Sequence, residues 1–473
     1  MINLHNVPKS SWIKFSIAAL LFVLWVIWIG NFWILLGLPL IFDIYITHLI
    51  PWGAWKKTKD GRKPPAWKEW LDALIFALVA VYLINIFFFQ NYKIPTSSLE
   101  KTLLVGDHLF VSKMSYGPRM PMTPISFPLV QNTFPLINSK SYSKKPQWDY
   151  KRIAGFGDVE RNDIVVFNFP AGDTAAFLRP NPSYFNIIRD IGQRRLRNTD
   201  SARNEYQQRL KEREAGAEYV RQNPREFGEV IAHPVDRRDN YVKRCVALPG
   251  DTFEIRHNQI YINGEAAEDP EGVQYNYNVV TDGTQLNKRF FERLGISNDD
   301  RYEGGMGPRY KLPLTMDMRE QVEKMSFIEE VNIVEVEPDS SKRQVFPYSK
   351  HFLWSRDNYG PLVIPRKGKT VDISLENILL YERIIVNHEG NSLEVKNNRI
   401  FINGEETESY TFDMDYYFMM GDNRHKSADS RYWGFVPEDH IVGQPLLVWL
   451  SLDKDKSFPF NIRWNRFFKY AGN

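Results

Sequence analysis

The chain of 473 residues contains a single cysteine, Cys245, and no marked excess of charge of either sign. One cysteine excludes an internal disulfide and a multi-cysteine zinc site, and a lone cysteine is usually a small buried hydrophobic residue. The 60 Lys and Arg residues nearly balance the 57 Asp and Glu residues, which leaves a net charge of +3. Because nucleic-acid-binding proteins normally carry a strongly basic face, this composition gives no support to a nucleic-acid partner.

Motifs for metal and phosphate binding are missing as well. The nine histidines include no H-E-x-x-H motif and no other close pair with the spacing of metal ligands. The sequence also lacks a Gly-rich phosphate-binding loop, so ATP-driven chemistry has no support. We therefore expect an activity that uses neither a metal ion nor an organic cofactor.

Apolar residues are concentrated near the N-terminus, in three runs, of which the first (15–29) contains no charge. A membrane span needs about 20 apolar residues to cross about 30 Å of hydrocarbon. Residues 1–92 are thus expected to form a membrane anchor with three spans, at about 13–30, 32–50 and 71–90. Two spans with one re-entrant segment is the alternative. A cleavable signal peptide is disfavoured for the first run because no small-x-small cleavage site follows it.

The loop between the second and third expected spans is basic and indicates the orientation of the anchor. Against Asp60 and Glu69 it carries Lys56, Lys57, Lys59, Arg62, Lys63 and Lys68. Short basic loops stay on the cytoplasmic side, so residues 93–473 are expected outside the cytoplasm. The missing disulfide and the long insertions described below suggest a multi-pass protein of a bacterial plasma membrane, in contact with membrane lipid.

The segment 93–473 has short alternating or β-branched runs broken by Gly, Asn and Pro, which predicts a mainly antiparallel β domain. Two of these runs, 251–265 and 391–405, match nearly position for position. Each reads as a hairpin, and we interpret the pair as a repeated structural element. Two polar stretches at about 171–240 and 266–357 look inserted, and the first has the charge-dense character of surface helices.

Two further segments combine apolar and polar residues in a way that suits a membrane surface. Residues 118–148 are rich in Pro and Ser with apolar residues between them, which predicts an extended loop able to rest on the bilayer. The C-terminal end places aromatic residues among Arg and Lys, namely Trp464, Phe467, Phe468 and Tyr470. The alternative for this end is a final edge strand that covers the core.

Ser98 lies just beyond the third apolar run and is a candidate nucleophile. With Lys101 it forms an S-x-x-K sequence, the nucleophile motif of penicillin-binding proteins. That mechanism places the two residues one turn apart on a helix and needs S-D-N and K-T-G partners, both of which this sequence lacks. Residues after Lys101 also alternate as in a strand, which disfavours this interpretation.

Five segments of the chain together form a longer pattern: IPTSSL at 94–99, NDIVVF at 162–167, YVKRCVALPGD at 241–251, YFMMGDNR at 417–424 and SADSRYWG at 427–434. In this order, and beginning just outside an apolar run, they resemble the conserved boxes of type I signal peptidases. The boxes cover under half of the chain, and the two insertions have no counterpart in them. The resemblance implies a membrane-bound serine endopeptidase with the mainly antiparallel β fold of that family.

The resemblance assigns Ser98 as the acylated nucleophile and Lys243 as the general base. A serine hydroxyl is a weak nucleophile and needs a base within hydrogen-bonding distance. A lysine can be that base only if its amine is neutral near pH 7, and burial among apolar groups lowers a lysine pKa in that direction. Apolar neighbours of Lys243 such as Val246 and Leu248 are suited to provide this burial.

Supporting roles follow from the same resemblance. The hydroxyl of Thr96, with the backbone N–H at the nucleophile, matches the donors that stabilise the oxyanion. Ser427 matches the hydroxyl that orients the lysine. Asp429 and Arg431 match a supporting ion pair.

Ile94 and Val242 match the residues that line pockets for small side chains, as in Ala-x-Ala cleavage sites. The sequence departs from the family at Leu99, where Met is common, and at Lys101, where Pro is common. Leu and Met are similar in volume, so the first change is expected to matter little. The second places another amine near the nucleophile and leaves two lysines as candidates for the base, of which strand geometry favours Lys243.

The resemblance implies removal of signal peptides from exported precursor proteins, through an acyl-enzyme and after small-x-small sites. The alternative from another class is a non-catalytic, membrane-tethered scaffold for exported proteins on the same fold. A decayed homologue would be expected to lose Ser98 or Lys243, and both are present. This favours the enzyme. The sequence carries no signal for an oligomeric state.

Overall fold

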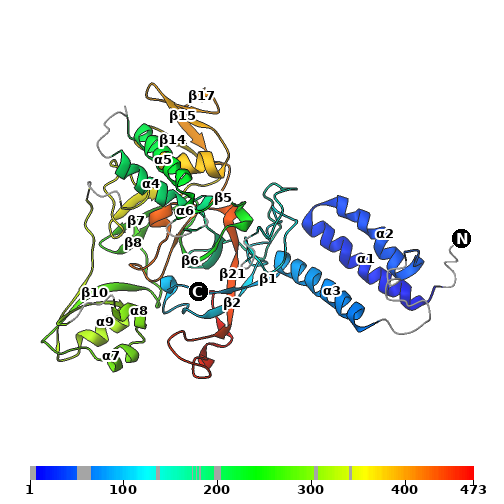
Figure 1. Cartoon of the computed structure of the whole chain (residues 1–473), viewed down its shortest axis with the longest axis horizontal. Helices are drawn as coiled ribbons and strands as arrows, with labels where there is room; N and C mark the ends of the chain where they lie inside the picture. Colours follow the sequence, from blue (N-terminus) through cyan, green and yellow to red (C-terminus); the bar gives the residue numbers. More distant parts are fainter. Residues whose placement is uncertain are drawn as a thin grey trace.

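The structure is a computed structural model that describes residues 7–50, 65–134, 139–172, 174–176, 178–179, 183–196, 204–302, 307–339 and 344–472. A helical N-terminal part stands apart from a larger body made mainly of antiparallel sheets (Figure 1). This confirms the fold class that the sequence predicts.

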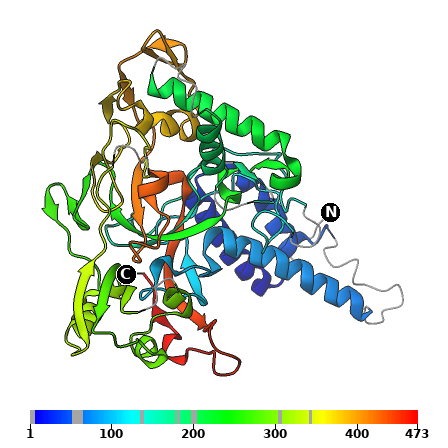
Figure 2. The same cartoon turned by 60° about the vertical axis from the view of Figure 1, so that its left-hand side comes forward.

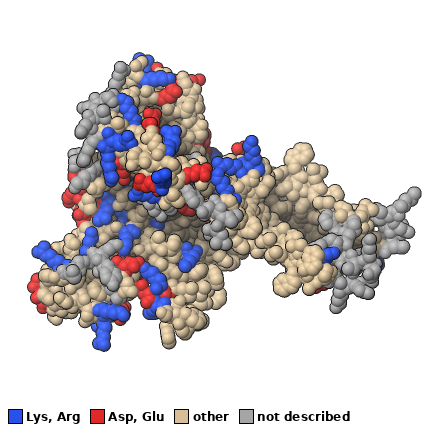
Figure 3. Space-filling view, in the orientation of Figure 1, with Lys and Arg blue, Asp and Glu red and all other residues tan. Residues whose placement is uncertain are grey.

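Two helices of the N-terminal part are long and apolar enough to cross a membrane. They are α1 (Lys9–Ile29), with 21 residues, and α3 (Ala66–Phe87), with 22 residues. At 1.5 Å per residue each is about 30 Å long, which matches the hydrocarbon thickness. Most of their apolar side chains are exposed, and the surface of this part is largely free of charge (Figure 3).

The second apolar run is shorter than the predicted span at 32–50. It forms a 3₁₀ turn, a short helix and a π turn, namely η2 (Phe32–Gly37), α2 (Leu38–Phe42) and η3 (Asp43–Thr47). The Asp43 carboxylate accepts hydrogen bonds from the Thr47 hydroxyl and from backbone N–H groups just beyond η3. Three spans therefore stay a prediction. Lys68 lies in the first turn of α3, and the other basic residues of the predicted loop lie outside the described residues.

The main sheet runs in the order β1-β2-β21-β3-β6-β19-β20, with β22 added to β21. All its pairings are antiparallel. Its strands are β1 (Phe89–Lys93), β2 (Asp107–Ser112), β3 (Ile164–Asn168), β6 (Asn240–Ala247), β19 (Tyr416–Met420), β20 (Val436–Pro437), β21 (Ile441–Ser451) and β22 (Lys469–Tyr470). The strand β6 lies between β3 and β19, in the middle of the sheet. Strand β1 follows α3 directly.

The central strands are buried on both faces, which explains why they read as continuous apolar runs. Ile164 and Val166 pack in one apolar cluster, whereas Val165 and Phe167 pack in another. Cys245 belongs to the second cluster and is completely buried, so its predicted packing role is confirmed.

The two matching segments form the two hairpins that the sequence predicts. They are β7 (Thr252–Arg256) with β8 (Gln259–Ile262), and β15 (Leu393–Lys396) with β16 (Arg399–Ile402). Both turn residues of each hairpin have positive φ, at His257-Asn258 and Asn397-Asn398. Positive φ at both positions is typical of the tight turns that match the twist of two strands. The hairpins belong to different sheets, with short third strands β9 (Glu265–Ala266) and β17 (Glu405–Glu406) and with β13 (Tyr359–Val363) beside β7.

The first predicted insertion is largely helical. It contains β4 (Thr174–Ala176), α4 (Tyr184–Arg195), α5 (Glu205–Gln222), α6 (Pro224–Phe227), β5 (Val230–Ala232) and η6 (Val235–Arg237). The helices α4 and α5 pack closely at Gly192 and Gly216. A Cβ atom at either glycine would lie within 2 Å of a backbone oxygen of the other helix, so this crossing requires glycine.

The second predicted insertion contains a small subdomain with an apolar cluster of its own. It consists of β10 (Gln274–Thr281), α7 (Lys288–Arg293), α8 (Asn298–Tyr302), β11 (Arg309–Thr315), α9 (Met316–Glu323) and β12 (Ile328–Ile333). The subdomain lies beside the C-terminal segment (Figure 2), where Asn298 N–H donates to Asp455 and Lys454 pairs with Asp299.

Short elements complete the body: η5 (Ser97–Leu99), β14 (Thr370–Asp372), α10 (Ile378–Arg383), η7 (Ile384–His388), β18 (Ser409–Thr411), α11 (Ser430–Trp433), η8 (Glu438–His440) and η9 (Trp464–Arg466). Of these, η5 and α11 carry predicted site residues.

Candidate active site

The candidate nucleophile, Ser98, lies in the one-turn 3₁₀ segment η5 that follows β1. The next residue, Leu99, is 1% exposed and fixes this turn in the apolar cluster below it. Ser98 itself is half-buried. The turn therefore holds the hydroxyl in place while leaving it accessible.

Lys243, in the middle of β6, reaches the same hydroxyl. Its Nζ lies 2.5 Å from Ser98 Oγ and donates a further hydrogen bond of 3.1 Å to the Val242 carbonyl. Lys243 is 3% exposed. The structure thus brings together two predicted residues that are 145 positions apart in the sequence.

Burial lowers the pKa of Lys243 from its ordinary value near 10.5 to about 8, and the carboxylates of Asp429 and Asp422 oppose part of this shift. Burial has this effect because the charged ammonium loses its hydration, whereas the neutral amine loses little. About a tenth of the molecules therefore carry a neutral amine at pH 7, and about half do so at pH 8. A neutral amine at hydrogen-bonding distance from a serine hydroxyl can act as a general base.

Lys101, the other lysine near the nucleophile, points elsewhere. Its Nζ donates hydrogen bonds of 3.1 and 2.7 Å to the carbonyls of Leu294 and Gly295, at the end of α7. Lys101 also has a positive φ of 76° and lies outside η5. The one-turn helical arrangement of the S-x-x-K motif is therefore not formed.

The Gly-Asp-Asn-Arg turn that follows β19 (residues 421–424) is hydrogen-bonded to the backbone of the nucleophile segment. Asn423 N–H donates to the Ser98 carbonyl at 3.1 Å, and its side-chain amide donates to the Ser97 carbonyl at 3.3 Å. A Cβ atom at Gly421 would lie 2.5 Å from the Ser98 carbonyl oxygen and 2.3 Å from Ser427 Oγ. Glycine is required at 421 because the two segments approach so closely.

A fully buried ion pair connects this turn to the strand of the candidate base. Arg244 donates to both carboxylate oxygens of Asp422, at 2.8 and 2.7 Å, and to the Asn162 carbonyl. Asp422 also accepts a hydrogen bond of 2.6 Å from the Thr102 hydroxyl, four residues beyond the nucleophile. From the Gly-Asp-Asn-Arg box the sequence predicts a structural role for Asp422, Asn423 and Arg424 in shaping the site, whereas the sequence analysis did not assign a role to Arg244. The place of Arg244 inside one of the matched boxes was the available signal.

Asp429 and Arg431 form the predicted ion pair. Arg431 Nη2 and Asp429 Oδ2 are 2.8 Å apart, and both side chains are almost completely buried. Asp429 also accepts from Gly421 N–H, which ties the pair to the turn under the nucleophile. The hydroxyl of Ser427 is buried, and it has no hydrogen-bond partner in the described part of the chain.

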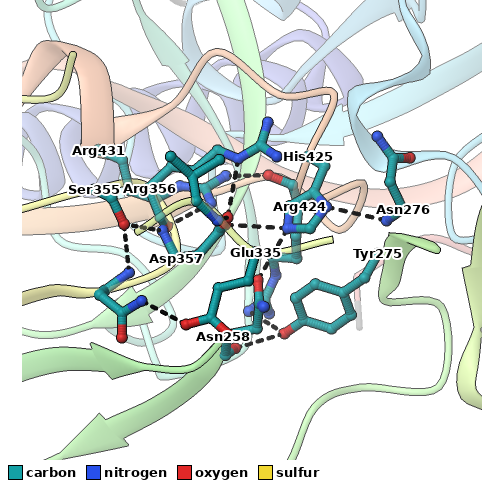
Figure 4. A network of polar contacts seen from close by, with 12 residues as sticks. Asn258, Tyr275, Asn276, Glu335, Ser355, Arg356, Asp357, Arg424, His425 and Arg431 are labelled. Atoms are coloured by element: carbon teal, nitrogen blue, oxygen red, sulfur yellow. Dashed lines mark hydrogen bonds and ion pairs between the residues drawn. The ribbon is translucent and has the colours of Figure 1, made fainter. Parts of the chain in front are cut away.

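A polar network continues from this ion pair into the second insertion (Figure 4). Arg431 donates to the Arg356 carbonyl at 3.2 Å. His425 Nδ1 accepts from Asn276 N–H at 3.1 Å, while its Nε2 lies 2.9 Å from Asn258 Oδ1 and 3.1 Å from Asp357 Oδ1. Since a backbone N–H donates to Nδ1, the proton of the neutral ring is on Nε2. Burial lowers the pKa of His425, which favours this neutral form.

The second insertion also contacts the turn under the nucleophile and the segment that follows the nucleophile. Its strand β10 begins beside the supporting turn, where Gln274 N–H donates to the Asp422 carbonyl at 2.9 Å. A Cβ atom at Gly272 would lie 2.1 Å from Thr102 Oγ1. Together with the bonds of Lys101, these contacts make the subdomain part of the support of the site.

The remaining predicted residues lie around the dyad. Thr96 is exposed, two residues before the nucleophile. Ile94 is buried and Val242 is partly buried, and both belong to the apolar cluster that contains Leu99. All eight predicted site residues thus lie on three stretches of the chain: 94–98 (the end of β1 to η5), β6 and 427–431.

Comparison with known proteins gives one matching family model and several relatives. The model described as "Signal peptidase, peptidase S26" matches residues 67–298 and 409–450, more than half of the chain. A signal peptidase I of Helicobacter pylori strain J99 is 34% identical over 85% of this chain and 90% of its own length. Those of Buchnera aphidicola from Acyrthosiphon pisum and of Haemophilus influenzae are each 24% identical, over 82% and 85% of this chain and 77% and 74% of their own lengths.

Proposed function

The chain belongs to the peptidase S26 family of signal peptidases, and we propose that it removes signal peptides from exported precursors with a Ser98–Lys243 dyad. The observation that carries the proposal is the 2.5 Å contact between Lys243 Nζ and Ser98 Oγ, made by a buried lysine with a lowered pKa. The family accounts for the class of enzyme, a serine peptidase. The dyad accounts for how it works.

In the proposed acylation step, neutral Lys243 takes the proton of the Ser98 hydroxyl as Oγ attacks the carbonyl carbon of the scissile bond. The developing oxyanion accepts hydrogen bonds from the Ser98 N–H and from the Thr96 hydroxyl, each contributing about 3 kcal/mol where such donors have been measured. The ammonium of Lys243 then gives its proton to the leaving amine, and the peptide bond breaks.

In the proposed deacylation step, water takes the place of the Ser98 hydroxyl as the nucleophile. A water molecule attacks the acyl-enzyme, Lys243 accepts its proton, and the same ammonium returns a proton to Ser98 Oγ as the signal peptide leaves. The Asp429–Arg431 pair holds the turn at Gly421 through the hydrogen bond from Gly421 N–H to Asp429. Ser427, whose hydroxyl lies against the same turn, is assigned the role of orienting the amine during the cycle. The cycle uses only groups of this chain and water.

Substrate selection is assigned to the apolar surface beside the dyad. Ile94 lies four residues before Ser98 and Val242 directly precedes Lys243, and both residues belong to one apolar cluster. An apolar surface accepts small apolar side chains and offers no partner to charged ones. We therefore expect cleavage after small-x-small sequences.

Membrane anchorage by α1 and α3 is part of the proposal. The C-terminal ends of both helices meet the β body: Ile29 and Phe87 pack with Ile153, and Trp28 donates to the Ala154 carbonyl at 3.0 Å. Helices that end on the same side fit a multi-pass anchor with the catalytic body outside the cytoplasm. The enzyme would then meet precursors that are still held in the membrane.

The test is cleavage of a purified signal-peptide-bearing precursor by the full-length protein in detergent with lipid. We expect a single cut after a small-x-small sequence, located by mass spectrometry, and no cut by the Ser98→Ala and Lys243→Met variants. Lys101→Met is the matched control, because this lysine is close to the nucleophile but bonded to the end of α7.

Activity that survives in Lys243→Met but is lost in Lys101→Met would identify Lys101 as the base. No cleavage of several precursors by the intact protein would support the scaffold alternative.

A further inference from the structure

A cavity of about 350 Å³ lies where the end of α3 meets the β body. It is bounded by Tyr82 and Ile86 of α3, by Tyr92 of β1 and by the loop 119–131. Tyr82 donates a hydrogen bond to the Pro124 carbonyl, which joins the helix to this loop. The dyad does not line the cavity.

The cavity is unusually rich in positive charge. Lys113, Arg119 and Arg237 line it, and Asp236 is the only carboxylate among its described lining residues. Buried or partly buried charges are normally paired, because an unpaired ion loses hydration without compensation. Three basic side chains facing one carboxylate make this cavity electrostatically suited to an anion.

Internal hydrogen bonds hold the arginines and the carboxylate in place. Arg119 donates to Asn168 Oδ1 at 2.6 Å and to the Asp439 carbonyl, and Arg237 Nε donates to Thr123 Oγ1 at 2.7 Å. Asp236 accepts two hydrogen bonds from Thr123 and lies 4.0 Å from Arg237 Nε. These groups form a fixed polar wall.

Lys113 differs from the two arginines. The Lys113 ammonium makes no hydrogen bond or ion pair with any residue in the described part of the chain. Burial, followed by the neighbouring charges of Arg119 and Arg237, lowers its pKa to about 7. An anion between these groups would satisfy the ammonium and relieve the repulsion.

The position of the cavity relative to the apolar surface suggests the source of the anion. Phe127 and Leu129 line the cavity and are also strongly exposed, beside exposed Ile125. These side chains lie next to the last turns of α3, at the level where a spanning helix leaves the hydrocarbon. Charged and apolar groups at that level match a phosphate headgroup and its acyl chains, respectively.

We propose that this cavity is a binding site for the phosphodiester of an anionic phospholipid, with Lys113 as its principal contact and Phe127 and Leu129 against the acyl chains. The site rests on the membrane anchorage proposed above but not on the dyad. A precursor fits the cavity less well, because the small uncharged side chains of its cleavage region offer nothing to three cations.

The test measures lipid retention by the full-length protein after purification in detergent, using native mass spectrometry. The probes are phosphatidylglycerol, diacylglycerol, which has the same chains without phosphate, and sodium phosphate. We expect saturable binding of one phosphatidylglycerol and about tenfold weaker retention in Lys113→Gln, the loss of one charge-assisted contact. The control Lys144→Gln removes an exposed lysine outside the cavity and should retain the lipid as the intact protein does.

The other outcomes each overturn the proposal. Equal retention in Lys113→Gln means that the lipid binds elsewhere, and equal retention of diacylglycerol means that only the apolar surface binds. Sodium phosphate binding as tightly as the lipid indicates a site for the free anion. The same measurements are repeated in the Ser98→Ala protein, so that lipid retention is measured independently of cleavage. Arg237→Gln provides a second cavity variant if Lys113→Gln does not fold.

Discussion

Replacing Lys243 with methionine should abolish cleavage and also stabilise the folded protein. Methionine fills a similar volume without a charge, in a place where the lysine is 3% exposed. Most substitutions of buried residues destabilise proteins, so a gain in stability would be informative. It would show that the lysine is held in an unfavourable environment for the sake of its chemistry.

The size of the effect follows from the pKa. A pKa of about 8 in place of the ordinary value near 10.5 means that burial of the ammonium costs about 3 kcal/mol at pH 7. Loss of the hydrogen bond to Ser98 offsets about 1 kcal/mol of the gain. The variant should therefore be more stable by about 2 kcal/mol.

The gain in stability of Lys243→Met over the intact protein must also decrease as the pH rises. Below the folded pKa of about 8 the lysine is charged in both the folded and the unfolded chain, and the full cost is present. Above it the folded side chain is neutral, and the cost disappears as the pH approaches the unfolded pKa near 10.5. The difference between the two proteins should thus shrink between pH 8 and pH 10.5.

The assay is urea unfolding in detergent, followed by tryptophan fluorescence, at pH 6.5 and pH 9.5. Lys101→Met is the control and should destabilise the protein, because that ammonium makes two hydrogen bonds to carbonyls. The reasoning is wrong if Lys243→Met is less stable than the intact protein at pH 6.5, or if the difference in stability does not change with pH. Either result would mean that burial of the Lys243 ammonium does not destabilise the folded protein.

Three further predictions concern the same site. The kcat/KM of the intact enzyme should rise about tenfold per pH unit up to pH about 8 and then level off, because Lys243 must be neutral; a flat profile between pH 6 and 8 contradicts this. Gly421→Ala should reduce kcat by more than about tenfold, because its methyl group would lie 2.5 Å from the Ser98 carbonyl oxygen; an unchanged single-turnover rate would show that the turn can move. Asp429→Ala should destabilise the protein by about 3–5 kcal/mol, because it leaves Arg431 charged and buried, and a small change in urea midpoint would argue against this.

Several features of this protein could be derived from the sequence because they depend on local patterns. Uninterrupted apolar runs produced α1 and α3, whose length follows from the hydrocarbon thickness. Paired Asn-containing turns produced the two similar hairpins, since a positive φ is a property of the turn residues themselves. The matched boxes identified Ser98 and Lys243 because each box is contiguous.

Other features were decided only by the tertiary structure, because they depend on contacts between distant segments. Nothing near Lys101 in the sequence shows that its ammonium is bonded to the end of α7, almost two hundred residues later. The same holds for Asn423 beneath the nucleophile. The second apolar run is shorter than its composition predicted, and the carboxylate of Asp43 is satisfied beside its last turn.

The environment of Lys243 shows most clearly which features depend on the sequence and which depend on the tertiary structure. The sequence supplies a lysine flanked by apolar residues, which makes a lowered pKa plausible. Whether the amine is buried, and whether it faces a serine, depends on β6 lying in the middle of the sheet with the nucleophile turn packed beside it. A pKa is set by hydration and by charges a few ångströms away, and only the folded chain determines both.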